Sequence, residues 1–374
     1  MTNAPKGEGL TYAAAGVDTH AGDRAVELMK AAVKKTHGAS VVDGVGGFAG
    51  LIDVSALKNY ERPLLASSTD GVGTKIAIAQ ALDVHDTIGH DLVAMVVDDI
   101  VVSGAKPLAM TDYIACGKVH PERIANIVRG IAEGCILAET ALVGGETAEH
   151  PGLMGEHDYD VAGAAVGVVE ASQMLGAERV KAGDVLIGMD SSGLHSNGYS
   201  LVRAVVDHAG LSLDQYIDDF GTTLGEELLT PTHIYSAQIL RVLEKAGVGN
   251  LHALSHVTGG GLAANLARVI PTDCGAHVRR GSWEPGAVFR AIGEWGNVPL
   301  ADLEATLNMG IGMVAVVSEE SADAIVRHFE AEGVRSRVIG EVTRREELAQ
   351  PRGENDVLVQ GAKGAHGGPV LVTA

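Results

Sequence analysis

The sequence predicts a two-domain protein of the α/β or α+β class, and three observations support this. Short apolar runs typical of buried strands alternate with segments of helical periodicity in both halves of the chain. The 374 residues are enough for two domains of roughly 100–200 residues each. Hydrophobic residues make up 46% of the composition and charged residues 20%, so the chain can bury a sizeable core.

The first half of the chain is expected to follow a short arm. Residues 1–20 are rich in Ala and Gly and predict an extended N-terminal arm. Residues 21–35 carry apolar side chains at helical spacing and predict an amphipathic helix. Four apolar runs predict strands, at 63–68, 108–116, 141–143 and 161–169. Two longer periodic segments predict helices, at 87–102 and 121–139.

A second unit begins after the polar turn at 181–184. A strand is expected at 185–189 and another at 313–317, with helices at 198–208 and 232–246. We therefore place a domain boundary near residue 175, which gives domains at 21–175 and 176–345. Residues 346–374 are rich in Gly and polar side chains and predict a flexible tail.

Composition excludes several classes of function. The 28 Lys and Arg against 48 Asp and Glu give a net charge of -20, which disfavours wrapping nucleic acid. A nucleotide can still bind through Mg²⁺ and backbone N–H groups. The three cysteines form no CxxC pair and suit a reducing cytosol. No signal peptide is predicted, because the N-terminus MTNAPKGEGL lacks an apolar stretch. No membrane span is predicted, because Asp98 and Asp99 interrupt the most apolar segment, so we expect a cytoplasmic protein.

The segment Asp70-Gly71-Val72-Gly73-Thr74-Lys75 combines an acid at the end of a predicted strand with two glycines. Such an acid can hold a metal ion while the glycine backbone approaches phosphates. An ordinary glycine turn is the alternative. The segment is not a Walker A loop, because the pattern GxxxxGK[ST] occurs nowhere in the chain.

Three further acids lie in the apolar helix predicted at 87–102. Asp91 and Asp98 share one face of a regular helix, and Asp99 points about 100° away from Asp98. Buried carboxylates need a cation, a metal or water, so these acids are candidates for a site. A helix end with simply solvated acids is the alternative.

Glycines and acids recur at 144–149, in GGETAE, where Glu146 and Glu149 could complete a Mg²⁺ shell or cap a helix. At 191–200, small donors crowd the start of a predicted helix and could bind a phosphate. His195 among them could donate to an oxyanion or move a proton, although a lone histidine is more often structural. His256 precedes three glycines, and 308–313 forms another glycine turn.

The order of these motifs is more specific than any one of them. Ten stretches resemble, in sequence order, the aminoimidazole ribonucleotide synthetase family, also called the phosphoribosylformylglycinamidine cyclo-ligase family. They are YAAAGVDTHAGD (12–23), GGFAGL (46–51), TDGVGTK (69–75), HDTIGHDLVAM (85–95), DYIACGK (112–118), GGETAEHPG (144–152), SSGLHSNGYSLVR (191–203), PTHIY (231–235), HVTGGG (256–261) and LNMGIGM (307–313). The resemblance covers about residues 10–345 and leaves out the Gly-rich tail.

The resemblance implies an α+β fold and an activity. Family members look like homodimers of two-domain subunits, in which the N-terminal mixed sheets of both subunits pair into a barrel and the C-terminal domain is an α/β sandwich. The implied reaction converts formylglycinamidine ribonucleotide and ATP into aminoimidazole ribonucleotide, ADP and phosphate, in purine biosynthesis. Mg²⁺ is required and K⁺ commonly assists. No nucleic acid and no membrane are implied as partners.

The resemblance also suggests roles for particular residues. The implied catalytic residues are His195, His256 and Asp99. The implied metal ligands are Asp70, Asp99 and, as a further candidate, Glu146. The residues implied around the nucleotide are Lys30, Asp70, Gly71, Gly73, Thr74, Lys75, Gly144 and Gly145. Those implied around the substrate are Ser192, Asn197, Thr258, Gly259 and Gly260. Which histidine moves the proton stays open.

Two departures and several rivals accompany the resemblance. Asp98 stands where many relatives are expected to have Asn, and His150 where Met is common. We expect Asp98 to face water or a cation, or to lie near the metal. The rival activities are those of thiamine monophosphate kinase, selenophosphate synthetase and a hydrogenase maturation factor. The C-terminus LVTA without cysteine, the lack of an N-terminal redox cysteine and the motif SSGLHSNGYSL disfavour them. A catalytically silent nucleotide-binding scaffold is the alternative from another class.

Overall fold

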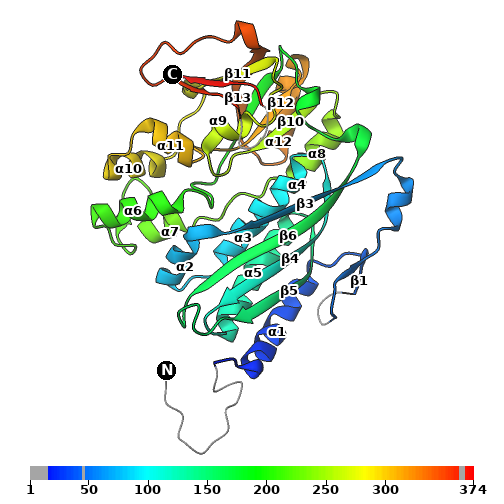
Figure 1. Cartoon of the computed structure of the whole chain (residues 1–374), viewed down its shortest axis with the longest axis vertical. Helices are drawn as coiled ribbons and strands as arrows, with labels where there is room; N and C mark the ends of the chain where they lie inside the picture. The colour runs from blue at the N-terminus through cyan, green and yellow to red at the C-terminus, as the bar shows by residue number, and fades with distance from the viewer. Residues whose placement is uncertain (1–15, 44–46, 362–366) are drawn as a thin grey trace, which may run out of the picture.

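Two β-sheets organise the molecule, one in each half of the chain (Figure 1). The computed structural model describes residues 16–43, 47–361 and 367–374. Most of the arm predicted at 1–20 therefore lies outside the described residues. The α+β class expected from the family is confirmed, since the strands pair mainly antiparallel and helices cover the sheets.

The N-terminal sheet has four strands in the order β3-β6-β4-β5. Their bounds are β3 Pro63–Gly71, β6 Tyr159–Glu170, β4 Lys106–Cys116 and β5 Ala141–Glu149. Only the β4·β5 pair is parallel, so the sheet is mixed, as predicted. The strands β1 (Val41–Asp43) and β2 (Leu51–Ile52) form a separate small ribbon.

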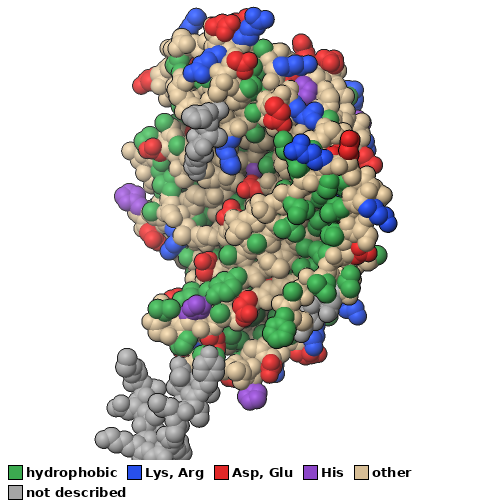
Figure 2. Space-filling model, turned by 45° about the vertical axis from the view of Figure 1, so that its right-hand side comes forward, with side chains coloured by type: hydrophobic (Ala, Val, Ile, Leu, Met, Phe, Trp, Pro, Cys, Tyr) green, Lys and Arg blue, Asp and Glu red, His purple; other side chains and the backbone are tan. Residues whose placement is uncertain are grey.

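Helices cover one face of this sheet and leave the other open. The covering helices are α1 (Thr19–Lys34), α3 (Thr87–Val93) and α5 (Pro121–Leu137). The open face exposes Leu65 by 71%, and Tyr113 and Val166 by 42% each. Figure 2 shows hydrophobic side chains gathered on this side of the molecule. The described part of one chain does not close this sheet into a barrel.

The helix predicted at 87–102 is present, but it is not a regular α-helix throughout. It comprises α3, a π-helical turn at Ala94–Asp98 and the short α4 at Asp99–Val101. A π turn accommodates a local insertion in a helix and is frequent at functional sites. Regular helical angles therefore do not describe how Asp98 and Asp99 point.

The C-terminal sheet has seven strands in the order β10-β12-β7-β13-β11-β15-β14. The first five along the chain are β7 Val185–Asp190, β10 Leu251–His256, β11 Cys274–Arg279, β12 Ile311–Val317 and β13 Ser336–Arg344. Helices α8 (Ser236–Ala246) and α12 (Ala322–Ala331) pack on one face and α9 (Gly261–Leu266) on the other. The helix predicted at 232–246 corresponds to α8, which begins at Ser236, four residues after the predicted start.

The prediction of a flexible tail is wrong for the described residues after 345. Strands β14 (Val357–Val359) and β15 (Val370–Thr373) complete the C-terminal sheet. β15 pairs in parallel with β11, and Val370 and Leu371 are fully buried. The sequence did not predict β15, because the strand consists of only four apolar or β-branched residues that follow a Gly-rich stretch.

One large hydrophobic cluster contains residues from both halves. The helices α6 (Tyr199–Ala209), α10 (Ala287–Gly296) and α11 (Leu300–Thr306) follow the predicted boundary in sequence. Their buried residues Tyr199, Phe289 and Leu303 nevertheless belong to the same cluster as Leu92 of α3. The short helices α2 (Ile76–Leu82) and α7 (Leu224–Leu228) complete this junction. None of the helices within the described ranges is both long and apolar enough to cross a membrane.

Candidate active site

The predicted acids and histidines converge where the two halves meet. Asp70 lies at the end of β3, Asp99 begins α4, and His256 ends β10. His195 follows β7 in the loop before α6. Four segments that are distant in sequence therefore contribute to one region.

His256 and Asp99 form a hydrogen-bonded pair in which only the imidazole is buried. The Nδ1–H of His256 donates to Asp99 Oδ1 at 2.9 Å. The imidazole is 2% exposed, whereas the Asp99 side chain is 38% exposed. Burial opposes a charge on the ring, but the hydrogen bond to Asp99 and the nearby carboxylates outweigh it and raise the pKa of His256. Its Nε2 is buried without a hydrogen-bond partner among the described residues.

Asp70 and Asp99 form a pair of accessible carboxylates. Asp70 Oδ1 accepts the N–H of Gly71 at 2.7 Å, and the side chain is otherwise exposed. Partial burial and repulsion from Asp99 raise the pKa of Asp70. Two repelling carboxylates at a solvent-accessible junction fit Mg²⁺, which commonly uses one or two carboxylates together with substrate phosphates.

Glu146 does not join these acids within one chain. Across the described residues, no three His, Cys, Asp or Glu side chains gather in a metal-binding group. Glu146 lies at the far edge of the sheet from Asp70, because the residues paired across the four strands are Asp70, Gly163, Asp112 and Gly145. Three strand spacings correspond to about 14 Å. The segment 144–149 is also part of β5 and not a glycine turn, so no helix begins there for Glu146 to cap.

A cavity of about 460 Å³ lies beside these residues of β5. It is lined by Gly144, Gly145 and Glu146, by apolar residues of α1, and by Asp112 of β4. Burial raises the pKa of Asp112 to about 7. A Cβ at position 145 would lie 2.3 Å from Asp112 Oδ1, so only glycine leaves room for this carboxyl group. Lys30, also on α1, pairs with Glu27 at 2.9 Å on the exposed surface and does not line the cavity.

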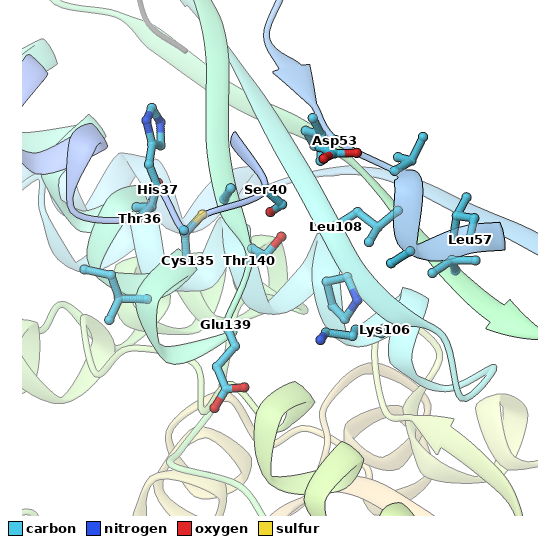
Figure 3. A pocket seen from close by; sticks show the side chains of 18 of the residues that line it. Thr36, His37, Ser40, Asp53, Leu57, Lys106, Leu108, Cys135, Glu139 and Thr140 are labelled. Atoms are coloured by element: carbon cyan, nitrogen blue, oxygen red, sulfur yellow. The ribbon is translucent and has the colours of Figure 1, made fainter. Parts of the chain in front are cut away.

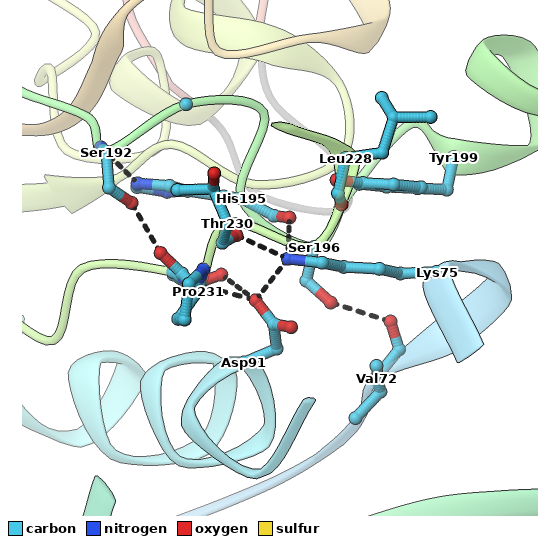
Figure 4. A network of polar contacts seen from close by, with 12 residues as sticks. Val72, Lys75, Asp91, Ser192, His195, Ser196, Tyr199, Leu228, Thr230 and Pro231 are labelled. Carbon is cyan, nitrogen blue, oxygen red and sulfur yellow. Dashed lines mark hydrogen bonds and ion pairs between the residues drawn. The ribbon is translucent and has the colours of Figure 1, made fainter. Parts of the chain in front are cut away.

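Lys75 was expected to contact the nucleotide, but its side chain is buried within the protein. Its side chain is completely buried, and Nζ donates to Asp91 Oδ1 at 2.9 Å, His195 O at 3.0 Å and Thr230 O at 2.7 Å (Figure 4). The prediction that Lys75 binds ATP is therefore wrong for this conformation. Asp91 has the cation that its burial requires.

His195 is held in an uncommon backbone conformation. Its φ angle is 64°, in the left-handed region that residues other than glycine rarely adopt. The imidazole is buried, and the Ser192 N–H donates to its Nε2 at 3.2 Å. Burial keeps the pKa of His195 well below its usual value, and His256, Lys75 and His233 lower it further. The ring is therefore neutral, with its proton on Nδ1.

Asp98 has a structural role that the sequence did not reveal. It is fully buried, and both carboxyl oxygens accept the N–H of Tyr235, at 3.2 and 3.1 Å. Tyr235 is the N-cap residue of α8, so Asp98 caps this helix from another segment. Burial raises the pKa of Asp98 to about 7. Of the three surroundings expected for Asp98, water is therefore wrong, because the side chain is fully buried.

The predicted substrate residues lie in loops held by side chains. Ser192 Oγ donates to Pro231 O at 2.7 Å and lines a cavity of about 320 Å³. Asn197 Nδ2 donates to Met95 Sδ at 3.1 Å, and so faces the core. The turn of Thr258, Gly259 and Gly260 is fixed by Asn265, whose Nδ2 donates to Thr258 O at 3.1 Å.

The glycine segment after Asp70 is tied to the C-terminal half. Gly73 has a φ angle of 76°, which favours glycine. Thr74 Oγ1 lies 3.1 Å from Ser200 Oγ, and Ser196 Oγ donates to Val72 O at 2.7 Å. These contacts hold the segment against the loop that carries His195.

A further cavity of about 500 Å³ lies apart from the predicted site (Figure 3). Lys106, Leu108, Cys135, Glu139 and Thr140 are among its lining residues, and none of the predicted site residues is. Burial raises the pKa of the Cys135 thiol, so this cysteine is not a thiolate nucleophile.

Sequence reasoning missed several residues that shape the site. Asp112 was detectable as the single acid in an apolar strand. The Tyr235 hydroxyl donates to Asp190 O at 2.8 Å. Nothing in the sequence indicated this contact, apart from the position of Tyr235 in the PTHIY motif. Asn308 Nδ2 donates to Gly193 O at 2.9 Å and fixes the loop before His195.

The fold and the site together define a class of protein. A family model described as AIR synthase related protein, N-terminal domain, matches residues 49–169, and its C-terminal counterpart matches residues 181–349. The fold resembles that of thiamine-monophosphate kinase from Stenotrophomonas maltophilia, with a TM-score of 0.61 at 20% identity over 86% of this chain and 93% of that one. A hydrogenase maturation protein HypE gives a TM-score of 0.61 at 17% identity over 91% and 95%.

Sequence relatives narrow this class. Phosphoribosylformylglycinamidine cyclo-ligase of Alkaliphilus oremlandii is 47% identical over 89% of this chain and 97% of its own length. The cyclo-ligases of Geobacillus kaustophilus and Carboxydothermus hydrogenoformans are 49% and 48% identical over 89% and 90% of this chain, and 95% and 97% of their own lengths. The chain belongs to the phosphoribosylformylglycinamidine cyclo-ligase family, as the ordered motifs predicted.

Proposed function

We propose that this protein is the ATP-dependent ligase that converts formylglycinamidine ribonucleotide into aminoimidazole ribonucleotide, ADP and phosphate. Relatives with 47–49% identity over about nine tenths of the chain carry the name of this cyclo-ligase. The observation that carries the proposal in the structure is the accessible pair Asp70 and Asp99 beside His256. Ring closure belongs to a purine biosynthetic route.

The chemistry requires activation of a poor leaving group. The formyl oxygen of the substrate attacks the γ-phosphorus of ATP, ADP leaves, and an O-phosphorylated imidate forms. The amidine nitrogen then attacks the activated carbon, a C–N bond closes the ring, and loss of a proton and phosphate gives the product. Such a transfer depends on positioning and charge neutralisation more than on a protein nucleophile.

Each residue has a role that follows from its geometry. Asp70 and Asp99 would hold Mg²⁺, which neutralises charge on the transferred phosphoryl group. Asp99 also orients the His256 ring through the 2.9 Å hydrogen bond. The neutral His195 ring has its proton on Nδ1, which is buried and has no hydrogen-bond partner among the described residues, while its Nε2 accepts the Ser192 N–H. The proposed role of this unpaired N–H is to donate a hydrogen bond to negative charge that develops when substrate is bound.

The nucleotide and the dimer belong to the same proposal. The cavity beside Gly144, Gly145 and Glu146 offers apolar walls from α1 and a polar end at Asp112, which suits a nucleoside. The exposed Leu65, Tyr113 and Val166 support a homodimer formed through the open face of the N-terminal sheet. A K⁺ requirement and a cytoplasmic location stay predictions from the family resemblance.

One assay tests the activity. Purified protein is given ATP, Mg²⁺ and formylglycinamidine ribonucleotide, and ADP release and imidazole formation are measured together. We expect ADP release that depends on the amidine ribonucleotide. ATP turnover with thiamine monophosphate or selenide, and none with the amidine ribonucleotide, would contradict the proposal.

Variants assign the metal ligands. Asp70→Asn and Asp99→Asn should each lower kcat about 100-fold or more, because each removes a charge from the proposed Mg²⁺ site. Asp323→Asn, at an exposed position in the first turn of α12, is the matched control and should stay near normal. Normal kcat with an unchanged Mg²⁺ requirement removes the tested acid from the site.

A further inference from the structure

A closed ring of hydrogen bonds surrounds the loop that carries His195 (Figure 4). Its first half starts at the completely buried Lys75. The three N–H groups of its ammonium have three acceptors: Asp91 Oδ1, His195 O and Thr230 O. No donor of Lys75 is left for a ligand, so its role is within the protein.

The second half of the ring returns from Asp91 to the His195 imidazole. Asp91 Oδ1 also accepts the N–H of Thr232 at 2.9 Å, which fixes the segment 230–232. Ser192 Oγ donates to Pro231 O at 2.7 Å in that segment. The N–H of Ser192 then donates to His195 Nε2 at 3.2 Å. The ammonium thus fixes the His195 carbonyl and, through Asp91 and Ser192, the tautomer of its ring.

A stability role alone explains this arrangement poorly. A buried ion pair loses hydration on both partners and often contributes little to the free energy of unfolding compared with apolar residues of the same shape. His195 meanwhile has a left-handed backbone, which persists only where surrounding contacts enforce it. The Lys75 bond to the His195 carbonyl is such a contact, and Gly312 leaves the ring its space, since a Cβ there would lie 2.5 Å from His195 Cε1.

We propose that Lys75, with Asp91 as its counter-ion, is a positioning residue for His195 in ring closure. The inference rests on the proposed function, and it gives Lys75 a role other than contact with ATP. Lys75 holds the His195 carbonyl, Ser192 holds Nε2, and the imidazole presents its proton on Nδ1. Removal of the ammonium leaves the nucleotide-binding groups in place but releases the His195 loop.

The test separates positioning from nucleotide binding. Lys75→Met keeps the length of the side chain and removes its charge. The double variant Lys75→Met/Asp91→Asn leaves no unpaired buried charge and serves if the single variant does not fold. We expect kcat for imidazole formation to fall about 100-fold, the loss typical of a catalytic group displaced by about 1 Å, while the KM for ATP changes less than about threefold. Lys245→Met, which breaks an exposed ion pair with Glu332, is the control.

A second readout does not depend on turnover. The ¹⁵N shifts of the His195 ring report its tautomer, and we expect Nδ1–H in the wild type and a mixture of tautomers in the double variant. A wild-type ring with the proton on Nε2 overturns the proposal whether or not the variants fold. A variant with raised KM for ATP and unchanged kcat, or with unchanged kcat and tautomer, overturns it as well. Failure of the proposed function is distinct, because the wild type then forms no imidazole product.

Discussion

Asp98 offers a sharp test of how the two halves are joined. The pair of substitutions Asp98→Asn and Asp98→Ala separates its hydrogen bonds from its charge. Asn keeps an oxygen that can accept the Tyr235 N–H, whereas Ala removes every acceptor and leaves the N-terminus of α8 uncapped in a buried position.

The expected magnitude follows from these contacts. Loss of a helix N-cap costs about 0.5–2 kcal/mol, and a buried N–H left without a partner costs about 1–3 kcal/mol. The Ala variant should therefore lose about 3 kcal/mol of unfolding free energy, and the Asn variant about 1 kcal/mol or less. For a unit of this size these losses correspond to Tm decreases of roughly 6–12 °C and roughly 2–4 °C.

Differential scanning calorimetry measures both decreases, and a Mg²⁺ titration of activity accompanies it. We expect Asp98→Asn to stay active, with at most about a tenfold change in apparent Mg²⁺ affinity. Equal thermal losses in the two variants would show that the charge of Asp98 matters and not its cap. An inactive Asp98→Asn together with an active Asp99→Asn would reverse the roles of these neighbours.

Three further predictions follow from other parts of the structure. Deletion of residues 350–374 removes β15, whose Val370 and Leu371 are fully buried, so Tm should fall by roughly 10 °C or more; an unchanged melting curve would refute the role of this strand. Gly312→Ala places a Cβ 2.2 Å from the Tyr235 hydroxyl and 2.5 Å from His195 Cε1, so kcat should fall about 100-fold, and normal kinetics would show that the loop adapts. The hydrogen bond to Asp184 raises the pKa of His252, so this pair stabilises the fold at low pH and its contribution is lost as pH rises through the folded pKa. His252→Gln should therefore lower Tm more at about pH 5.5 than at about pH 8.5, and an equal loss at both would contradict this assignment.

Local pattern alone determined most of the elements. Periodic apolar side chains located the helices α1, α5 and α6, because one buried face repeats every 3.6 residues. Apolar runs located the N-terminal strands, although β5 continues through 144–149 where glycines suggested a turn. Pairing with β4 decides that extension, and pairing partners are not visible in a local window.

The sequence by itself also determined the family, since ten motifs in a fixed order are far more specific than any one of them. It selected Asp70, Asp99, His195 and His256 as candidates, and their side-chain types suffice to suggest phosphoryl transfer. What each side chain contacts was decided by the tertiary structure. All four belong to different segments of the chain and meet only at the junction of the two halves.

Lys75 and Asp98 show the physical reason most clearly. A lysine after a glycine loop and an aspartate in a helix have the same local pattern whether they face a ligand or the protein. Burial removes the water around each charge, and only partners brought by folding can replace it. For Lys75 these partners are Asp91 and two backbone carbonyls. For Asp98 the partner is the backbone N–H at the start of α8. The contacts of Lys75 with Thr230 and of Asp98 with Tyr235 join positions 155 and 137 residues apart, so the local sequence could not assign them.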